Sequence, residues 1–212
     1  MEYSYYDMRV EMSKVAHLMF DRRLTNAAGG NFSVRVDENR ILLSPSMMSE
    51  NRHCELAPED FLLIDYDQNI LEGEGKLSRE TLMHVLILQN FKEIGSVIHA
   101  HPFYCMPYVA FGHAIPNVTE ATMGRGRVEV IPWRQAFTED LSRDVYKHWE
   151  ENRERAVKKP MGAIMQYHGV VVSGPTIYMA YSMLERIECD AFCSLSKGAV
   201  EATSDYTIPS LK

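Results

Sequence analysis

The stretch SVIHAHPFY, residues 96–104, places a short apolar run directly before two histidines and a proline. Successive side chains of a strand point to opposite faces, so His99 and His101 share one face of the predicted strand. Their Cα atoms should lie roughly 6.5 Å apart, from a rise of about 3.3 Å per residue. Two imidazole nitrogens can then converge on one metal ion at about 2.0–2.1 Å. The alternative interpretation is a strand end near solvent that carries two unrelated histidines.

Strand-like and helix-like segments alternate on both sides of this stretch, which predicts a single α/β domain. Apolar residues recur at helical spacing in four segments, which are 5–24, 77–90 with Ser78 as N-cap, 138–155 and 176–200. A short helix with Pro102 near its first turn should follow the strand predicted at 96–101. Strands are expected at 32–36, 40–46, 60–66, 96–101, 128–133 and, as a pair or one bent strand, 162–174. The domain should hold about six to nine strands flanked by helices, in an order that the sequence does not define.

Composition and charge exclude several classes of protein. The 212 residues are 46% hydrophobic and 24% charged, which is typical of a globular domain and argues against disorder. A net charge of −7 without a basic stripe argues against nucleic-acid binding. The chain has no apolar run near 18 residues, and its N-terminus is unlike a secretory signal, so we expect a cytoplasmic protein that does not contact membranes. The four cysteines should be buried thiols rather than a disulfide framework: Cys54, Cys105, Cys189 and Cys193.

A metal site needs a third ligand, and His168 is the best candidate among the other histidines. It stands between apolar, strand-like runs and precedes Gly169, a break at which a side chain can point into a cleft. A hydrogen-bonded histidine in a turn is the alternative. A metal site of this kind also needs a carboxylate. Glu80 is the candidate, because it lies at the start of an otherwise apolar helix. The helix dipole alone favours an acid there, but the same helix end also presents backbone N–H groups to an anion. His84 lies one turn later and could contact Glu80.

Five motifs that occur in order along the chain carry a resemblance to a known family: AGGNFSVR, LLSPS, KLSRE, VIHAHP and QYHGV. Together they resemble the class II aldolase/adducin family over roughly residues 8–200. The resemblance implies a single domain spanning 1–212, with a central mixed or antiparallel sheet flanked by helices and a mobile tail at about 202–212. It also implies one Zn²⁺ per subunit, held by His99, His101 and His168. Glu80 would be the catalytic acid/base and sometimes a further ligand.

The same resemblance implies a phosphate site at three turns of this chain. The positions that match are Gly30 and Asn31, then Ser46 and Met47, then Ser78 and Arg79. The aldolases of the family often have two serines at the last turn. Because Arg79 stands in place of the second serine, two alternatives are open: it donates to the phosphate with a charged group, or it points elsewhere.

A second departure concerns the part of the site that handles the aldehyde. In aldolases of the family, a tyrosine shortly after an Ile-Pro pair reaches the site from the neighbouring subunit and protonates the leaving fragment. Here Ile115-Pro116 is followed by NVTEATMG, so Glu120 or Thr119 stands near that position. Phe137 matches an aromatic residue that lines the aldehyde pocket. Tyr206 matches a tyrosine in the C-terminal tail.

The function implied by the resemblance is zinc-dependent cleavage of a ketose 1-phosphate to dihydroxyacetone phosphate and an aldehyde. L-Fuculose 1-phosphate or a related deoxy-ketose phosphate would be the substrate. L-Ribulose-5-phosphate 4-epimerase and sugar-acid phosphate decarboxylase activities of the same family are alternatives. A non-enzymatic, adducin-like module is disfavoured because the four candidate metal-site residues are all present. The resemblance also implies a homotetramer with active sites at subunit interfaces.

Overall fold

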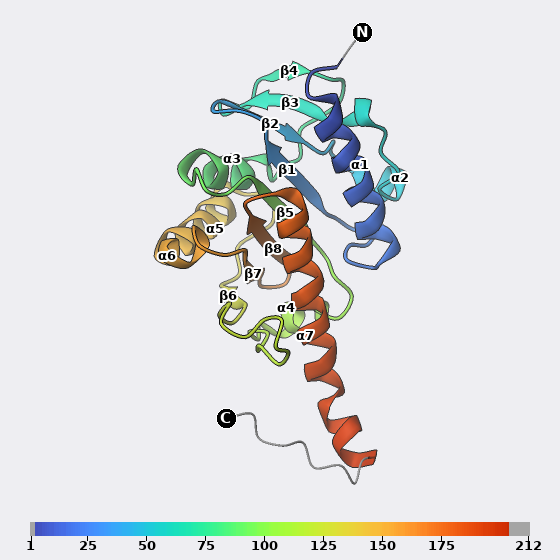
Figure 1. Cartoon of the computed structure of the whole chain (residues 1–212), viewed down its shortest axis with the longest axis vertical. Coiled ribbons are helices and arrows are strands. Elements are labelled where there is room, and N and C mark those ends of the chain that lie inside the picture. Colours follow the sequence, from blue (N-terminus) through green and yellow to red (C-terminus); the bar gives the residue numbers. More distant parts are fainter. Residues whose placement is uncertain (1–2, 204–212) are drawn as a thin grey trace.

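The computed structural model describes residues 3–203, and an eight-stranded sheet forms its centre (Figure 1). The strands are β1 Asn31–Arg35, β2 Arg40–Leu43, β3 Leu62–Asp65, β4 Ile70–Glu72, β5 Ser96–Ala100, β6 Glu129–Ile131, β7 Met161–Met165 and β8 Gly169–Gly174. Their order is β4-β3-β2-β1-β5-β8-β7-β6. All neighbours are antiparallel except β6 and β7, which are parallel. The predicted mixed sheet within one α/β domain is confirmed.

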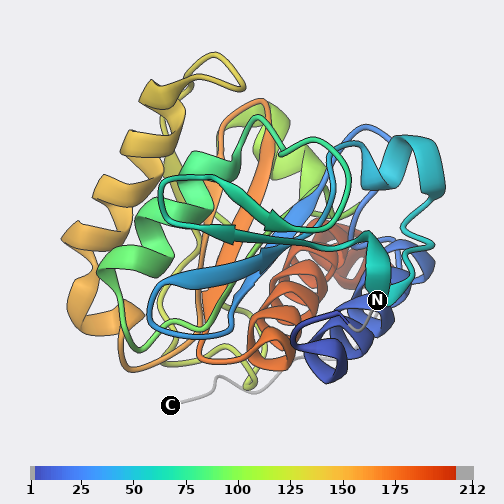
Figure 2. The ribbon, with the colours of Figure 1, turned by 90° about the horizontal axis from the view of Figure 1, so that it is seen from above.

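Helices cover both faces of the sheet (Figure 2). They are α1 Tyr6–Asp21, α2 Met48–Arg52, α3 Thr81–Asn90, α4 Met106–Phe111, α5 Glu139–Glu151, α6 Arg153–Ala156 and α7 Ile177–Thr203, with a 3-10 turn η1 at Pro58–Asp60. The helices α1 and α7 pack on one face, whereas α3 and α5 pack together on the other. None of the helices in residues 3–203 is long and apolar enough to cross a membrane.

Two apolar cores result from this layering, and β5 contributes to both. Ile98 and Ala100 pack into the core beneath α1 and α7. Val97 packs into the core beneath α3 and α5. Because side chains alternate along a strand, His99 shares the face of Val97 and points to the α3 side of the sheet. Every residue of β5 is buried, which explains why this strand appears in the sequence as a continuous apolar run.

Two predicted helix starts were wrong. Helix α3 begins at Thr81 with Glu80 at its N-cap, two residues after the predicted cap Ser78. The carbonyl of Ser78 accepts hydrogen bonds from both the backbone N–H and the hydroxyl of Thr81, which closes a separate turn before the helix. Pro102 does not lie in the first turn of α4, which begins at Met106. The carbonyl of Pro102 accepts from the N–H of Met106, so Pro102 begins a separate turn directly before α4, in which the N–H groups of Tyr104 and Cys105 donate to the buried carboxylate of Glu188 on α7.

The structure also differs from the predictions in a helix break, in three short elements and in the exposure of two cysteines. The predicted helix 138–155 is divided at Asn152, whose side-chain amide donates to the carbonyl of His148. The short elements α2, η1 and β4 were not predicted. Cys54 and Cys105 are buried as expected, but Cys189 and Cys193, one turn apart on α7, are exposed. The predicted tail at 202–212 lies almost wholly outside the described residues.

Candidate metal centre

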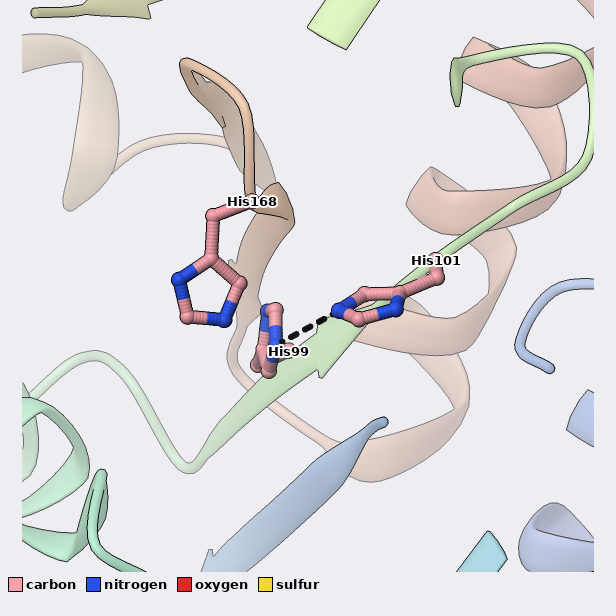
Figure 3. A group of neighbouring side chains, drawn as sticks. All are labelled: His99, His101 and His168. Carbon is pink, nitrogen blue, oxygen red and sulfur yellow. Dashed lines mark hydrogen bonds between the residues drawn. The ribbon is translucent and has the colours of Figure 1, made fainter. Parts of the chain in front are cut away.

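Three histidines converge at one end of β5 (Figure 3). His99 lies on β5, His101 directly after it, and His168 in the turn between β7 and β8. One potential ligand atom from each residue lies within 4.8 Å of the other two. The Nε2 atoms of His99 and His101 are 3.2 Å apart. Two nitrogens on one tetrahedral zinc ion are separated by about 3.3 Å when each Zn–N bond is about 2.0–2.1 Å.

Strand pairing determines where these rings lie. β5 runs between β1 and β8, so His99 is directly opposite Asn31 on one side and Val171 on the other. The Nδ1 atom of His99 donates to the carbonyl of Val170 at 3.0 Å. A neutral imidazole that carries its proton on Nδ1 has a free lone pair on Nε2. The Nε2 atom of His99 is therefore prepared to bind a cation.

The turn that carries His168 is held by two neighbouring segments. Its central residue, Tyr167, has a left-handed backbone (φ 63°) and donates its N–H to the carbonyl of Val109 on α4. The side chain of Gln166 accepts a hydrogen bond from the backbone N–H of Trp133 at 3.3 Å. These contacts fix the turn between β7 and β8, and with it the direction in which His168 points.

Two glycines leave room for the histidine rings. A Cβ atom on Gly169 would lie 2.6 Å from His101, 2.7 Å from the carbonyl oxygen of Ala100 and 2.8 Å from His99. A Cβ atom on Gly29 would lie 2.5 Å from His101. Real Cβ atoms do not approach other atoms so closely, so the rings can occupy these positions only because both residues lack side chains.

Glu80 brings a carboxylate to the same place. It is 5% exposed, and its Oε1 and Oε2 atoms lie 2.9 Å from His168 Nε2 and 3.5 Å from His99 Nε2. Burial raises the pKa of Glu80, but the facing imidazoles of His99 and His168 and a hydrogen bond from Asn31 outweigh that effect. The net pKa lies well below its ordinary value, so Glu80 is ionised at neutral pH.

The donor set fits a divalent cation such as zinc. Burial lowers the pKa of His99, and it lowers that of His101 to about 3, so both rings are neutral ligands at pH 7. Within residues 3–203, Glu80 Oε1 and His168 Nδ1 are buried without a well-formed hydrogen bond. Three imidazoles with one adjacent carboxylate match the ligands that zinc takes in catalytic sites.

A pocket opens beside the histidines, and it is lined by every residue predicted to bind the phosphate and by Phe137, which was predicted to line the aldehyde pocket. These residues are Gly30, Asn31, Ser46, Met47, Ser78, Arg79 and Phe137. Gly30 has a φ of 118°, and a Cβ atom there would meet Thr25 Oγ1 at 2.6 Å, so the turn requires glycine as expected. The sequence did not single out Ser49 and Glu50, which also line the pocket.

Arg79 and Phe137 form the rim of the pocket. The guanidinium carbon of Arg79 lies 3.5 Å from the centroid of the Phe137 ring, and that ring is 6.0 Å from the ring of His168. Both side chains are exposed. Arg79 is the sole lysine or arginine among the described residues that line this pocket. The rim therefore offers a cation and an aromatic face to whatever enters the pocket.

The remaining two candidates are Glu120 and Tyr206. Glu120 is exposed and is absent from the residues that line the pocket in the described part of the chain. The resemblance assigns it to the site of a neighbouring subunit, which a single chain does not test. Tyr206 lies outside the described residues.

The sequence missed one group of residues behind the pocket. His84 does not contact Glu80 directly. Its Nε2 atom lies 2.6 Å from Asn31 Oδ1, and Asn31 Nδ2 donates to Glu80 Oε2 at 2.7 Å. Its Nδ1 atom lies 2.8 Å from the hydroxyl of Ser33. The helical spacing of Glu80 and His84 was the only signal in the sequence, and it did not indicate the amide between them.

Comparison with known proteins agrees with this geometry. The family model "Class II Aldolase and Adducin N-terminal domain" matches residues 10–193. The chain is 30% identical over 179 residues to an L-fuculose phosphate aldolase of Methanococcus maripaludis, covering 84% of this chain and 91% of that protein. It is 27% identical over 209 residues to a 3-oxo-tetronate 4-phosphate decarboxylase of Haemophilus influenzae, covering 95% and 94% of the two chains.

A solved L-fuculose 1-phosphate aldolase has the same fold. It superposes with a TM-score of 0.77 at 22% identity, covering 99% of this chain and 93% of the other. At that identity the likeness concerns the fold alone. The match to the family model, by contrast, spans most of the sequence and includes every motif that carried the resemblance. The chain belongs to the class II aldolase and adducin family.

Proposed function

We propose that this chain is a zinc-dependent aldolase that cleaves a ketose 1-phosphate into dihydroxyacetone phosphate and an aldehyde. The observation that carries the proposal is the convergence of three histidines and one ionised carboxylate in a pocket lined by the predicted phosphate-binding turns. L-Fuculose 1-phosphate or a related deoxy-ketose phosphate is the proposed substrate. The similarity to an L-fuculose phosphate aldolase of M. maripaludis supports this choice.

His99, His101 and His168 would hold the metal, with Glu80 beside it. When bound, the ion supplies Lewis-acid stabilisation of the negative charge that develops as the carbon–carbon bond breaks. The buried walls around His99 and Glu80 exclude water, which strengthens electrostatic interactions in the pocket.

Glu80 is the proposed acid/base. As a carboxylate it can remove a proton from C3 of dihydroxyacetone phosphate in the condensation direction and return that proton to C3 in cleavage. The ionised state follows from its lowered pKa, to which His99 and His168 contribute. The hydrogen bond from Asn31 to Oε2 leaves Oε1 as the oxygen available for this transfer.

The substrate phosphate would bind at a distance from the chemistry and orient the sugar. Ser78, Ser46 and the backbone around Gly30 line one wall of the pocket, and Arg79 adds the positive charge. Phe137 would contact the aldehyde fragment. Glu120 of a neighbouring subunit and Tyr206 would complete the site on that side.

An oligomer is part of the proposal, because Glu120 would reach the site from a neighbouring subunit. Phe103 and Phe111 are 57% and 75% exposed and border an apolar groove next to His101. Such exposed aromatic surface is typical of protein interfaces. We propose a homotetramer of single-domain subunits, whose mass light scattering would measure.

A decarboxylase acting on a phosphorylated sugar acid is the second candidate. Arg79 favours it, since a guanidinium can bind a substrate carboxylate in a bidentate manner, and a decarboxylase from H. influenzae is 27% identical over nearly the whole chain. The epimerase of the same family would need a further acid/base pair, for which the pocket offers no assigned residues among those described.

A substrate screen tests the proposal. The zinc-loaded protein is incubated with ketose 1-phosphates, ketose 5-phosphates and phosphorylated 3-oxo acids, with and without chelator, and dihydroxyacetone phosphate and CO₂ are measured. We expect dihydroxyacetone phosphate from a ketose 1-phosphate, lost on chelation. Glu80→Gln should keep its zinc and lose about 10²–10⁴-fold in turnover. CO₂ release, or no product from any ketose 1-phosphate with zinc bound, would overturn the aldolase assignment.

A further inference from the structure

A buried chain of hydrogen bonds runs from Ser33 through His84 and Asn31 to Glu80. In each of these hydrogen bonds the donor and the acceptor can be assigned. Asn31 Nδ2 faces Glu80 Oε2 at 2.7 Å, and an ionised carboxylate only accepts, so the amide nitrogen must face Glu80. The carbonyl Oδ1 of Asn31 therefore faces His84 Nε2 at 2.6 Å, and Nε2 must donate. Nδ1 of the neutral ring then accepts from the hydroxyl of Ser33 at 2.8 Å.

The residues of this chain are closed off from solvent. Ser33 and His84 are 0% exposed and Asn31 is 5% exposed. A buried polar group without a partner is costly, so each member has one low-energy orientation as long as the next member is present. Removing the donor on His84 would leave Asn31 Oδ1 unpaired and allow the amide to turn.

The amide of Asn31 has two N–H groups, and the second connects the carboxylate to the phosphate-binding turn. It donates to Ser78 Oγ at 3.2 Å, and the same oxygen accepts from the backbone N–H of Glu80 at 3.2 Å. An oxygen that already accepts two hydrogen bonds has its own proton left to donate. Ser78 lines the pocket, so that proton is directed to whatever occupies it.

We propose that His84 is a positioning residue that fixes the Asn31 amide, so that one N–H holds the Glu80 carboxylate and the other makes the Ser78 hydroxyl a donor to the substrate's anionic group. Asn31 thus acts on the anion through Ser78 rather than by direct contact of its side chain. The assignment of Ser78 to the substrate phosphate rests on the proposed function. The arrangement links the proton-transfer end of the pocket to the anion-binding end through one amide.

A matched pair of substitutions tests the role of His84. In His84→Gln the amide nitrogen lies four bonds from Cα, as Nε2 of histidine does, and can still donate to Asn31. In His84→Asn the nitrogen lies three bonds from Cα and cannot reach it. We expect His84→Asn to lose about 10- to 100-fold in kcat, as is usual when a partner of an active-site group is removed. His84→Gln should stay within about threefold of the original chain.

Binding of inorganic phosphate separates this inference from the proposed reaction. Its dissociation constant is measured by calorimetry on the full-length zinc-loaded protein, and again after chelation, so no turnover is needed. We expect about tenfold weaker binding in His84→Asn and near-normal binding in His84→Gln, because one hydrogen bond to the anion is weakened. Equal phosphate affinity in both variants, or no phosphate binding by the original chain, would overturn the inference. Phosphate binding without cleavage of any ketose 1-phosphate would overturn only the proposed function.

A double-mutant cycle covers the case in which His84→Asn does not fold. Asn31→Ala and Ser78→Ala are combined, and phosphate affinity is measured for each single variant and for the double variant. If Asn31 acts through Ser78, the double variant binds no more weakly than Ser78→Ala alone. Additive losses would show that the two side chains contact phosphate independently and would contradict the inference.

Discussion

The floor of the pocket consists of His99, His101, His168 and Glu80, and its rim consists of Arg79 and Phe137. The side chains of these two regions are held in place in different ways. On the floor, His99 and Glu80 are 1% and 5% exposed, and both are held by hydrogen bonds to buried partners. On the rim, Arg79 and Phe137 are exposed and are held mainly by stacking on each other. Phe137 also has a left-handed backbone (φ 67°), which is uncommon for a residue with a large side chain.

This difference assigns separate tasks to the two regions. A rigid, dry floor suits the steps proposed for this chain, namely binding a cation and moving a proton. An exposed rim can change its side chains without disturbing the sheet. The departure from the family pattern at Arg79 lies on the rim, whereas the family residues on the floor are all present. Floor substitutions should therefore abolish metal binding or turnover, and rim substitutions should change substrate preference.

The largest effect is expected from His168→Ala. Removing one of three imidazoles should leave less than one zinc ion per ten subunits, because the other ligands cannot hold it alone. Activity should fall at least about 10³-fold, since a bound metal contributes several kcal/mol of transition-state stabilisation. Elemental analysis after gel filtration measures the zinc. Full zinc content in this variant would show that His168 is not a metal ligand.

Gly169→Ala tests whether the histidine rings on the floor need the space left by the missing side chain of Gly169. The added Cβ atom would lie within 2.8 Å of both His99 and His101, so the rings must shift. We expect zinc affinity to fall about 10- to 100-fold and the free energy of unfolding to fall by about 1–3 kcal/mol.

Gly198→Ala is the matched control for that substitution. Gly198 lies in α7, and its Cβ position has no described atom within 4 Å apart from those of its chain neighbours and of the backbone of its own helix. The control should keep its zinc and gain about 0.5–1 kcal/mol of stability from helix propensity. Similar zinc affinities for the two variants would show that the glycine beside the histidines has no special role.

The floor should also weaken in acid because His84 is buried. Burial lowers the pKa of His84 from an ordinary 6.5 to about 3. The unfolded chain therefore binds a proton below pH 6.5 that the folded chain does not, and stability falls as the pH falls towards 3. Between pH 6.5 and 5 the loss from this residue is about 2 kcal/mol.

Urea unfolding of the chelated protein at pH 7, 6 and 5 measures this loss. His99 and His101 add to the same trend, because burial lowers their pKa values too. His84→Gln removes only the contribution of His84, so its stability should fall less steeply with pH. Parallel pH curves for the two proteins would contradict the burial argument.

The sequence predicted local features of the site well, because they depend on short-range periodicity. The alternation along residues 96–101 put His99 and His101 on one face, and the break at Gly169 pointed to His168. The structure brings all three together as expected. The order of the strands was not predictable, since β5 pairs with β1 and β8, which are far from it in the sequence.

The supporting residues could not be predicted for the same reason. His84 and Asn31 are 53 positions apart and meet only because α3 packs over β1. The start of α3 was misplaced because Ser78 has the features of an N-cap, but its carbonyl closes a turn with Thr81 instead. Asn31 was assigned to phosphate from the family pattern, whereas both N–H groups of its side chain are used within the protein.

The smallest effect, and the sharpest test of the rim, is expected from Arg79→Ala. Losing the cation should raise KM for a phosphorylated substrate about tenfold, which corresponds to one charge-assisted hydrogen bond. Zinc content and kcat should stay near those of the original chain, since Arg79 hydrogen-bonds to no floor residue among those described. Arg79→Lys should be intermediate, because lysine keeps the charge but loses the planar group that stacks on Phe137.

Arg143→Ala supplies the control for Arg79→Ala. Arg143 is also exposed, but it pairs with Glu139 on α5 and does not line the pocket. Its loss should leave KM, kcat and zinc unchanged, because exposed ion pairs contribute little. If Arg79→Ala also leaves KM unchanged, the guanidinium does not bind the substrate. If Arg79→Ala loses zinc, the division between floor and rim is wrong, and the stacked pair must then help to hold His168, which Phe137 contacts.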